Sequence, residues 1–316
     1  MTIKKTTTPR LRARAFCPAT VANVAAGFDI LGYCLADIGD TVTVERTARI
    51  GVEITSIESS QDLPYDPLRN TASVALLALS EGLGLDFGFK IRIEKKIPLS
   101  SGMGGSAASC VAALVAANAL LPCPLSPVEL YPYALKGEYV ASGSCHGDNV
   151  GPALLGGLVV TTPNDLIPLS VPMHWHNLLV HPHAQLETRK ARAVLKDPFD
   201  VSQIVAQNAC LAQLLVGCLR ADSTLVAKGL KDVLIEPRRA ALIPGFKQAK
   251  NAALAANALG AGIAGAGPSL FAWFAHREQA QVAAVRVQEA FACEGMKSQY
   301  WLHPIMNPGA CLIAVD

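Results

Sequence analysis

The chain has 316 residues, of which 51% are hydrophobic and 16% are charged, and its formal net charge is +2. That composition is typical of a globular protein with a sizeable core, and it gives little electrostatic support for nucleic-acid binding. No apolar run approaches the ~20 residues of a membrane helix, no signal region opens the chain, and the 9 cysteines never form a C-x-x-C pair. We therefore expect a cytoplasmic protein that binds neither nucleic acid nor membrane.

Strand and helix patterns are mixed along the first half of the chain. Residues 87–94 alternate apolar and polar side chains, which predicts a half-buried strand. The Ala-rich run 107–121, stopped by Pro122, predicts a helix. Ser126, Pro127 and Glu129 form a capping box that should open a helix to about residue 142. Further strands are predicted at 10–16, 40–45, 49–55 and 156–162, and a helix at 71–84 ended by Gly82 or Gly84.

The second half mixes the two periods without strict alternation. Strands are predicted at 176–182 and 309–315, a strand–turn–strand unit at 260–274, and helices at 188–195, 200–220, 245–259 and 277–291. This order favours an α+β fold. We place a domain boundary near residues 163–170, which gives an N-terminal domain at 1–165 and a C-terminal domain at 166–316.

The loop "SSGMGGSAAS" at 100–109 joins the predicted strand to the Ala-rich helix. Gly102, Gly104 and Ala107 fit a dinucleotide fingerprint, but the acidic residue near the expected spacing, Glu129, lies in the capping box. A Walker A loop is excluded because no Gly-Lys-Ser/Thr ending is present. Two interpretations stay open from the loop alone: an anion cradle at a helix N-terminus, or a tight packing turn without a ligand.

Three motifs together resemble those of the GHMP kinases. Pro98 followed by 102–108 is similar to the family signature P-x-x-x-G-L-G-S-S-A-A, except that Gly105 replaces the first serine. Residues 17–32, "CPATVANVAAGFDILG", and 262–274, "GIAGAGPSLFAWF", resemble the opening and the third motif. The resemblance implies that the third motif is a glycine turn beside the phosphate loop. It also implies two α+β domains with the active site in the cleft between them.

Within the family, the segments at 137–157, 186–195 and 236–246 resemble those of homoserine kinases. The resemblance implies ATP-dependent phosphorylation of the side-chain hydroxyl of L-homoserine to O-phospho-L-homoserine, a step of threonine biosynthesis. Family members are often dimeric, so a homodimer is a possible assembly. The alternatives are a GHMP kinase for another alcohol, and an inactive ligand-binding relative, which the loss of a serine at Gly105 makes conceivable.

The resemblance also implies which residues bind MgATP. The phosphates would contact the loop, and Asn70 would lie near the adenine, although Asn70 is equally suited to cap a helix. Ser106 and Glu138 would hold Mg²⁺, which takes few protein ligands and keeps several waters. The expected loop residues are Pro98, Leu99, Ser100, Ser101, Gly102, Met103, Gly104, Gly105 and Ser106.

The amino-acid substrate would be bound from several segments. Arg192 and Arg239 would grip the carboxylate, because guanidinium forks suit carboxylates. Asp29 would meet the ammonium group. Asn23 would lie beside Asp29, and Thr188 would touch the hydroxyl or γ-phosphate region. His146 would contribute through its loop backbone or as a neighbour.

Asn149 is expected beside the reacting hydroxyl as a catalytic residue that acts by positioning rather than as a base. Asp148 is the rival candidate for a base, and we expect adjacent residues to point apart, so that only one faces the substrate. One cluster lies outside these motifs: His174, His176, His181 and His183. It could suggest a metal site, but we interpret it as solvated histidines at the end of a strand.

Overall fold

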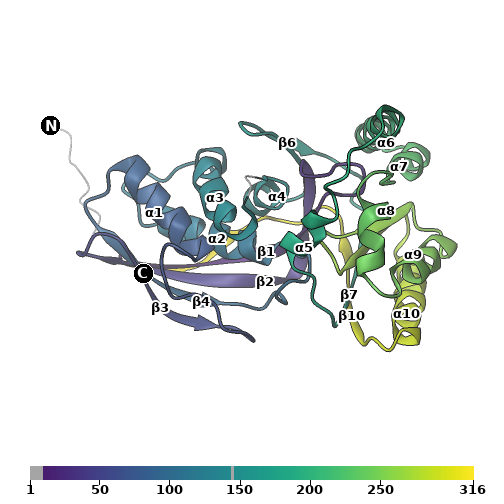
Figure 1. Ribbon diagram of the computed structural model, residues 1–316. Helices are drawn as coiled ribbons and strands as arrows, with labels where there is room; N and C mark the ends of the chain where they lie inside the picture. Colours follow the sequence, from purple (N-terminus) through teal and green to yellow (C-terminus); the bar gives the residue numbers. More distant parts are fainter. Residues whose placement is uncertain (1–9, 144–145) are drawn as a thin grey trace.

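The computed structural model describes residues 10–143 and 146–316, and these form two sheets lying side by side (Figure 1). The strand order of the first sheet is β11-β1-β2-β4-β3, with β5 on β2 and β6 on β5. The second sheet has the order β10-β7-β9-β8. The predicted mixed α+β architecture is therefore present among the described residues.

The first half carries the larger sheet. Its strands are β1 (Arg12–Ala22), β2 (Leu31–Thr47), β3 (Val52–Glu58), β4 (Gly88–Glu94), β5 (Leu158–Thr161) and β6 (Leu166–Leu169). Its helices are α1 (Thr71–Leu83), α2 (Gly105–Asn118), α3 (Pro127–Ser142) and α4 (Val150–Leu155). The helices cover one face of the sheet (Figure 1). The Ala-rich α2 packs against β1 and β2, because its small, buried side chains allow close approach.

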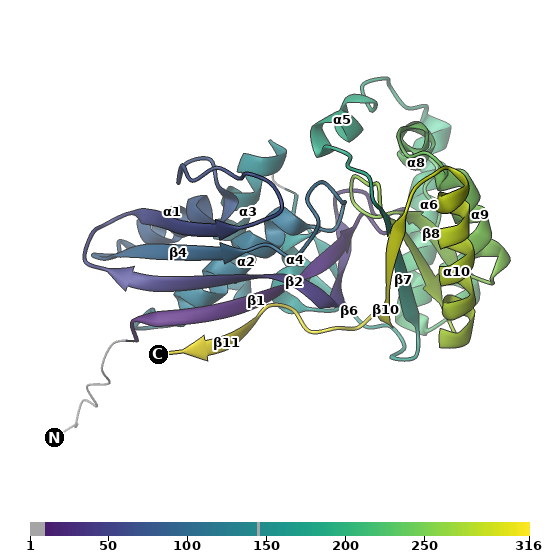
Figure 2. The same cartoon turned by 90° about the horizontal axis from the view of Figure 1, so that it is seen from below.

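The second half builds a smaller core on the other sheet. Its strands are β7 (His176–Pro182), β8 (Gly260–Ile263), β9 (Leu270–Phe274) and β10 (Ser298–Pro304). Its helices are α5 (Thr188–Ala193), α6 (Val201–Arg220), α7 (Ser223–Gly229), α8 (Glu236–Arg239), the short 3₁₀ turn η1 (Ala240–Leu242), α9 (Phe246–Ala255) and α10 (Arg277–Cys293). Helices α9 and α10 cover the outer face of this sheet (Figure 2). They bury apolar side chains against β7, β8 and β9.

Two strands cross the predicted division at residue 165. Strand β6 pairs with β5, and the last strand, β11 (Cys311–Val315), returns to pair antiparallel with β1 in the first sheet. The yellow end of the chain runs back along the β1 edge of this sheet (Figure 2). The division into 1–165 and 166–316 stays a proposal, and these pairings assign 166–169 and 311–315 to the first sheet.

Several predicted elements are confirmed closely. Helix α3 begins at Pro127 behind a complete capping box of Ser126 and Glu129. Helix α1 ends at Gly84, the second of its two predicted stops. Strand β2, in contrast, begins at Leu31 rather than at residue 40, because its first part pairs with β5 as well as with β1.

Helix α6 is, by length and composition, apolar enough to cross a membrane, contrary to the expectation that no segment qualifies. Its buried Gln207 nevertheless donates to the carbonyl oxygen of Ala26 and accepts the amide of Val233. A polar side chain satisfied in this way is typical of a helix packed within a folded protein.

Candidate active site

A cavity of about 420 Å³ is lined by residues from both halves of the chain. The glycine loop forms one wall, and the segment before α4, helix α5 and Arg239 contribute to the others. Every residue that the sequence nominated for the site lines this cavity. The structure thus brings the set together, whereas the individual roles stay predictions.

The glycine loop packs against the turn of the third motif. Gly102 and Gly104 have φ angles of 78° and 66°, which favour glycine. A Cβ on Gly102 would lie 2.3 Å from the carbonyl oxygen of Ala264, and the hydroxyl of Ser269 donates to the Ser101 carbonyl at 2.7 Å. The predicted packing of the glycine turn beside the loop is confirmed. The loop is a close-packed turn that also faces a cavity, with the N-terminal amide groups of α2 behind it.

Ser106 and Glu138 meet across the cavity wall, as the expected Mg²⁺ site requires. The Ser106 hydroxyl donates to Glu138 Oε1 at 2.9 Å. Burial raises the pKa of Glu138 to about 7, against the opposing effects of the Ser106 hydrogen bond and the Lys95 charge. A hydroxyl and a carboxylate are hard oxygen donors, so the pair fits Mg²⁺ in chemical type.

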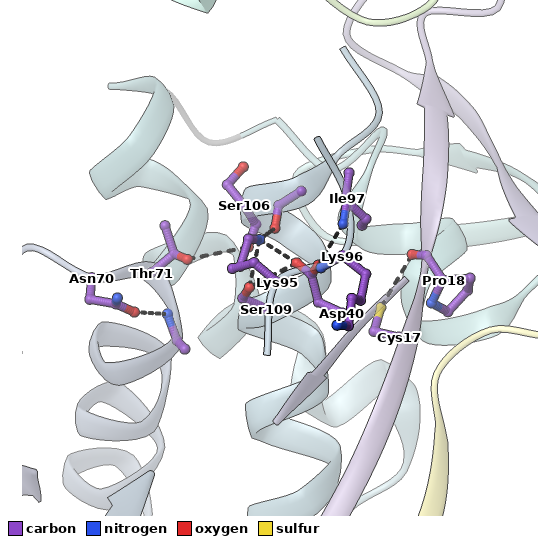
Figure 3. A network of polar contacts seen from close by, with 12 residues as sticks. Cys17, Pro18, Asp40, Asn70, Thr71, Lys95, Lys96, Ile97, Ser106 and Ser109 are labelled. Carbon is purple, nitrogen blue, oxygen red and sulfur yellow. Dashed lines mark hydrogen bonds and ion pairs between the residues drawn. The ribbon is translucent and has the colours of Figure 1, made fainter. Parts of the chain in front are cut away.

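A buried ion pair beside the loop was not predicted from the sequence. Lys95 Nζ contacts Asp40 Oδ2 and also donates to the Gly105 carbonyl at 2.6 Å and to Ser109 Oγ at 2.8 Å (Figure 3). The Lys95 side chain is 5% exposed and that of Asp40 is fully buried. Asp40 belongs to none of the sequence motifs, and Lys95 is one of two adjacent lysines. No local pattern in the sequence therefore marked either residue.

The opposite wall carries ionic side chains. Arg192 donates to Asp29 Oδ1 at 2.9 Å, and His146 Nδ1 lies 3.4 Å from Asp29 Oδ2. Burial lowers the pKa of His146, Asp29 opposes that shift, and Arg192 adds to it. Arg192 therefore pairs here with the residue expected to meet the substrate ammonium, an internal pairing that the motifs did not reveal.

Arg239 is buried and Arg238 is not. The guanidinium of Arg239 donates to the carbonyls of Ala191 and Gly265, at 3.0 and 3.1 Å. Arg238 is half-buried and donates to the carbonyls of residues 197 and 198, away from the cavity. Among the adjacent arginines, the one that the family register nominated is the one at the cavity.

The Asn23 amide links the opening motif to the third motif. Its Nδ2 donates to the Gly265 carbonyl at 2.7 Å, and its Oδ1 accepts the backbone amide of Asp29 at 3.0 Å. Both cavity arginines also lie near one aromatic ring. The guanidinium carbons of Arg192 and Arg239 lie 5.5 and 5.2 Å from the ring centroid of Phe28. These contacts fix the direction of the charged groups.

Asp148 and Asn149 both line the cavity, and which of the two side chains faces the substrate hydroxyl stays a prediction. Asn149 Oδ1 accepts from the Thr20 hydroxyl at 2.7 Å. Burial, followed by the charges of Asp29 and Glu138, raises the pKa of Asp148 to about 7.

Asn70 caps a helix and faces the cavity, which its two predicted interpretations allow. Its Oδ1 accepts the amide of Ala72 at 3.1 Å. Thr188, the first residue of α5, also reaches the cavity.

The histidine cluster is not uniformly solvated, contrary to prediction. His181 is buried, its Nδ1 lies 3.0 Å from the hydroxyl of Ser269, and burial lowers its pKa to about 4. His181 supports the same serine that contacts the glycine loop.

Comparisons with known proteins agree in both sequence and structure. Residues 70–157 match the GHMP kinases N terminal domain, and residues 214–293 match the GHMP kinases C terminal domain. A homoserine kinase of Xylella fastidiosa (strain 9a5c) is 58% identical over 303 residues, covering 96% of this chain and 94% of that protein. A homoserine kinase of Chloroherpeton thalassium is 43% identical, covering 94% of this chain and 98% of that protein.

Among solved structures, a homoserine kinase from Cytophaga hutchinsonii superposes with a TM-score of 0.93 at 38% identity. It covers 99% of this chain and is itself covered completely. The structure of L. major mevalonate kinase in complex with R-mevalonate has a TM-score of 0.67 at 18% identity, and the match covers 97% of this chain and 99% of that chain. The second likeness concerns the fold alone.

Proposed function

The chain belongs to the GHMP kinase family, and from that premise we propose that it transfers the γ-phosphoryl group of ATP to the side-chain hydroxyl of L-homoserine. The observation that carries the proposal is the arrangement of one cavity: a glycine loop on one wall, and Asp29, Arg192 and Arg239 on the other. Such a cavity suits an anion on one side and a zwitterionic amino acid on the other. The 58% identity to a homoserine kinase supports the choice of substrate.

The loop would bind the triphosphate. Its glycines admit the anion close to the backbone, and the amide groups at the start of α2 offer donors that the helix itself does not use. Asn70, at the far side of the same wall, would contact the adenine. These groups are preorganised, since the turn at 264–267 packs directly on the loop.

Ser106 and Glu138 would hold Mg²⁺, which supplies charge neutralisation of the phosphates when bound. The Ser106 hydroxyl donates to Glu138 Oε1 at 2.9 Å. That bond keeps the carboxylate directed at the loop. Burial raises the pKa of Glu138 to about 7, and a bound cation would favour the ionised carboxylate.

The amino-acid substrate would replace the ion pair between Asp29 and Arg192 with contacts of its own. Its ammonium group would take the place of Arg192 beside Asp29, and its carboxylate would contact Arg192 and Arg239. The side chains of Arg192 and Asp29 are 36% and 20% exposed. Because neither is fully buried, both can contact a ligand without large rearrangement. Asn23, His146 and Thr188 would complete the contacts.

Asn149 would position the hydroxyl for in-line attack on the γ-phosphorus, and ADP would leave as the bond between the γ-phosphorus and the bridging oxygen breaks. Phosphoryl transfer through a loose transition state needs positioning and charge stabilisation more than a strong base. Asp148 remains the rival acceptor for the proton, since its pKa lies close to neutrality. Loss of turnover in Asp148→Asn with full turnover in Asn149→Ala would reverse the assignment.

A coupled ADP-release assay with homoserine, mevalonate and galactose tests the proposal. We expect MgATP-dependent turnover with homoserine alone. Turnover with mevalonate or galactose but not homoserine would favour a GHMP kinase for another alcohol. Binding of homoserine without turnover would favour an inactive relative, although Ser106, Glu138 and Asn149 are all retained. The homodimer and the cytoplasmic location stay predictions.

A further inference from the structure

Asp40 connects the two ends of the phosphate loop. Its Oδ1 accepts the backbone amides of Lys96 and Ile97, at 2.9 and 3.1 Å, just before the loop begins at Pro98. Its Oδ2 accepts from Ser109 Oγ at 3.0 Å, one turn into the helix that follows the loop. One buried carboxylate therefore holds the chain on both sides of the glycine segment (Figure 3).

Lys95 completes the same connection. Its ammonium group has three donors, and these reach Asp40, the Gly105 carbonyl and Ser109 Oγ. All three are used, so the ammonium has no donor left for a ligand unless one of these bonds breaks. The charge of Lys95 is also balanced by Asp40, which makes the pair neutral as a unit.

The bond to Gly105 acts where the chain departs from the family signature. A Cβ on Gly105 would lie 3.5 Å from Lys95 Nζ and 3.4 Å from Ile97 Cγ2, so the space in which a serine side chain would stand is bounded by the ammonium. Lys95 thus fixes the first residue of α2 from this side. Ser106, which follows directly, is the residue expected to hold the metal ion.

We propose that Lys95 and Asp40 are a positioning pair that sets the phosphate loop for nucleotide binding, with Lys95 acting through the loop although its side chain also lines the cavity. The inference rests on the nucleotide-binding half of the proposed function. Its physical basis is that both ends of the loop are tied to one buried, mutually neutralised pair. Removing the pair frees the loop ends and lowers the fraction of molecules whose loop is ready to bind.

The test is calorimetric titration of a non-hydrolysable ATP analogue with Mg²⁺, beside thermal unfolding, for Asp40→Asn, Lys95→Met and the double variant. Each single change leaves one buried charge unpaired, which threatens folding. The double variant avoids that, since an asparagine at 40 can still accept the two backbone amides. Lys96→Met is the matched control, because Lys96 is exposed and only its backbone takes part.

We expect the double variant to fold and to bind the analogue at least tenfold more weakly, with homoserine affinity within twofold of the original. Asp40→Asn alone should also weaken nucleotide binding, and Lys96→Met should not. Two results would overturn the inference: a folded double variant that binds the analogue normally, or tighter binding in Asp40→Asn, which would make Lys95 a direct phosphate ligand. Failure of the unmodified protein to bind the analogue would instead reject the proposed function.

Discussion

The two walls of the cavity are held in place in different ways. The phosphate loop is fixed by backbone contacts and by the Asp40–Lys95 pair, whose side chains are at most 5% exposed. The opposite wall is fixed by ion pairs between side chains such as Asp29 and Arg192, which are 20% and 36% exposed. The difference suggests a preformed cradle for the nucleotide and an exchangeable charge pair for the amino acid.

The largest effect should come from disturbing the rigid wall. Gly102→Ala places a Cβ 2.3 Å from a backbone oxygen at a φ angle of 78°, so we expect a loss of about 3 kcal/mol or more in the free energy of unfolding. Nucleotide binding should be lost. Gly84→Ala, at a φ of 60° with open space around it, is the control and should cost about 1–2 kcal/mol. Equal losses for both would mean that the packed turn contributes nothing.

The next largest effect should separate the walls by ligand. Arg239→Gln removes a buried guanidinium, and we expect KM for homoserine to rise by about tenfold to a hundredfold while ATP binding changes little. Arg238→Gln, on the half-buried neighbour that does not line the cavity, should leave both constants unchanged. Initial-rate measurements with each substrate varied would decide the matter. An equal loss for both substrates would show that Arg239 is a general structural support.

The pH dependence of the free energy of unfolding should show the cost of ionising the buried Asp148 carboxyl. Burial raises the pKa of Asp148 from 3.8 to about 7, so the native state binds more protons than the unfolded state in that window. Stability therefore falls as pH rises from about 4 to 7. Asp148→Asn should remove this part of the fall and be more stable than the original protein above pH 7, by more than about 1 kcal/mol. Denaturant titrations showing a constant difference at all pH values would contradict this assignment.

The smallest effect is expected where charge is exposed and plays no part in the cavity. Lys190 and Glu187 form an ion pair with side chains 70% and 60% exposed. Lys190→Met should change the free energy of unfolding by less than about 0.5 kcal/mol and leave KM for homoserine unchanged. A clear rise in that KM would mean that charge anywhere on α5 attracts the substrate.

The sequence predicted much of the fold and most of the chain segments of the site, because local patterns and three motifs marked them. Strand β7 and helix α3 depend on nearby residues, and both were placed correctly. Strands β6 and β10 were missed because β6 contains Pro168 and because β10 carries polar residues on both faces, without the alternation that predicts a strand. Their stability comes from pairing with β5 and β7 rather than from their own pattern.

The missed parts of the site share a different cause. Asp40 and Lys95 lie 55 residues apart, and Asp29 and Arg192 lie 163 apart. Neither pair can be recognised until the sheet brings β2 beside the end of β4, or until helix α5 approaches the opening motif. Burial of His181 likewise follows from its place in β7.

The central claim is that the rigid wall and the exchangeable wall serve one reaction. Its most direct test is to incubate the protein with MgATP and L-homoserine and to identify the phosphorylated product by phosphorus NMR and mass spectrometry. The account predicts ADP and O-phospho-L-homoserine in equal amounts, and no product from an analogue that lacks the hydroxyl. ADP release without phosphohomoserine, or phosphorylation at another group, would contradict it.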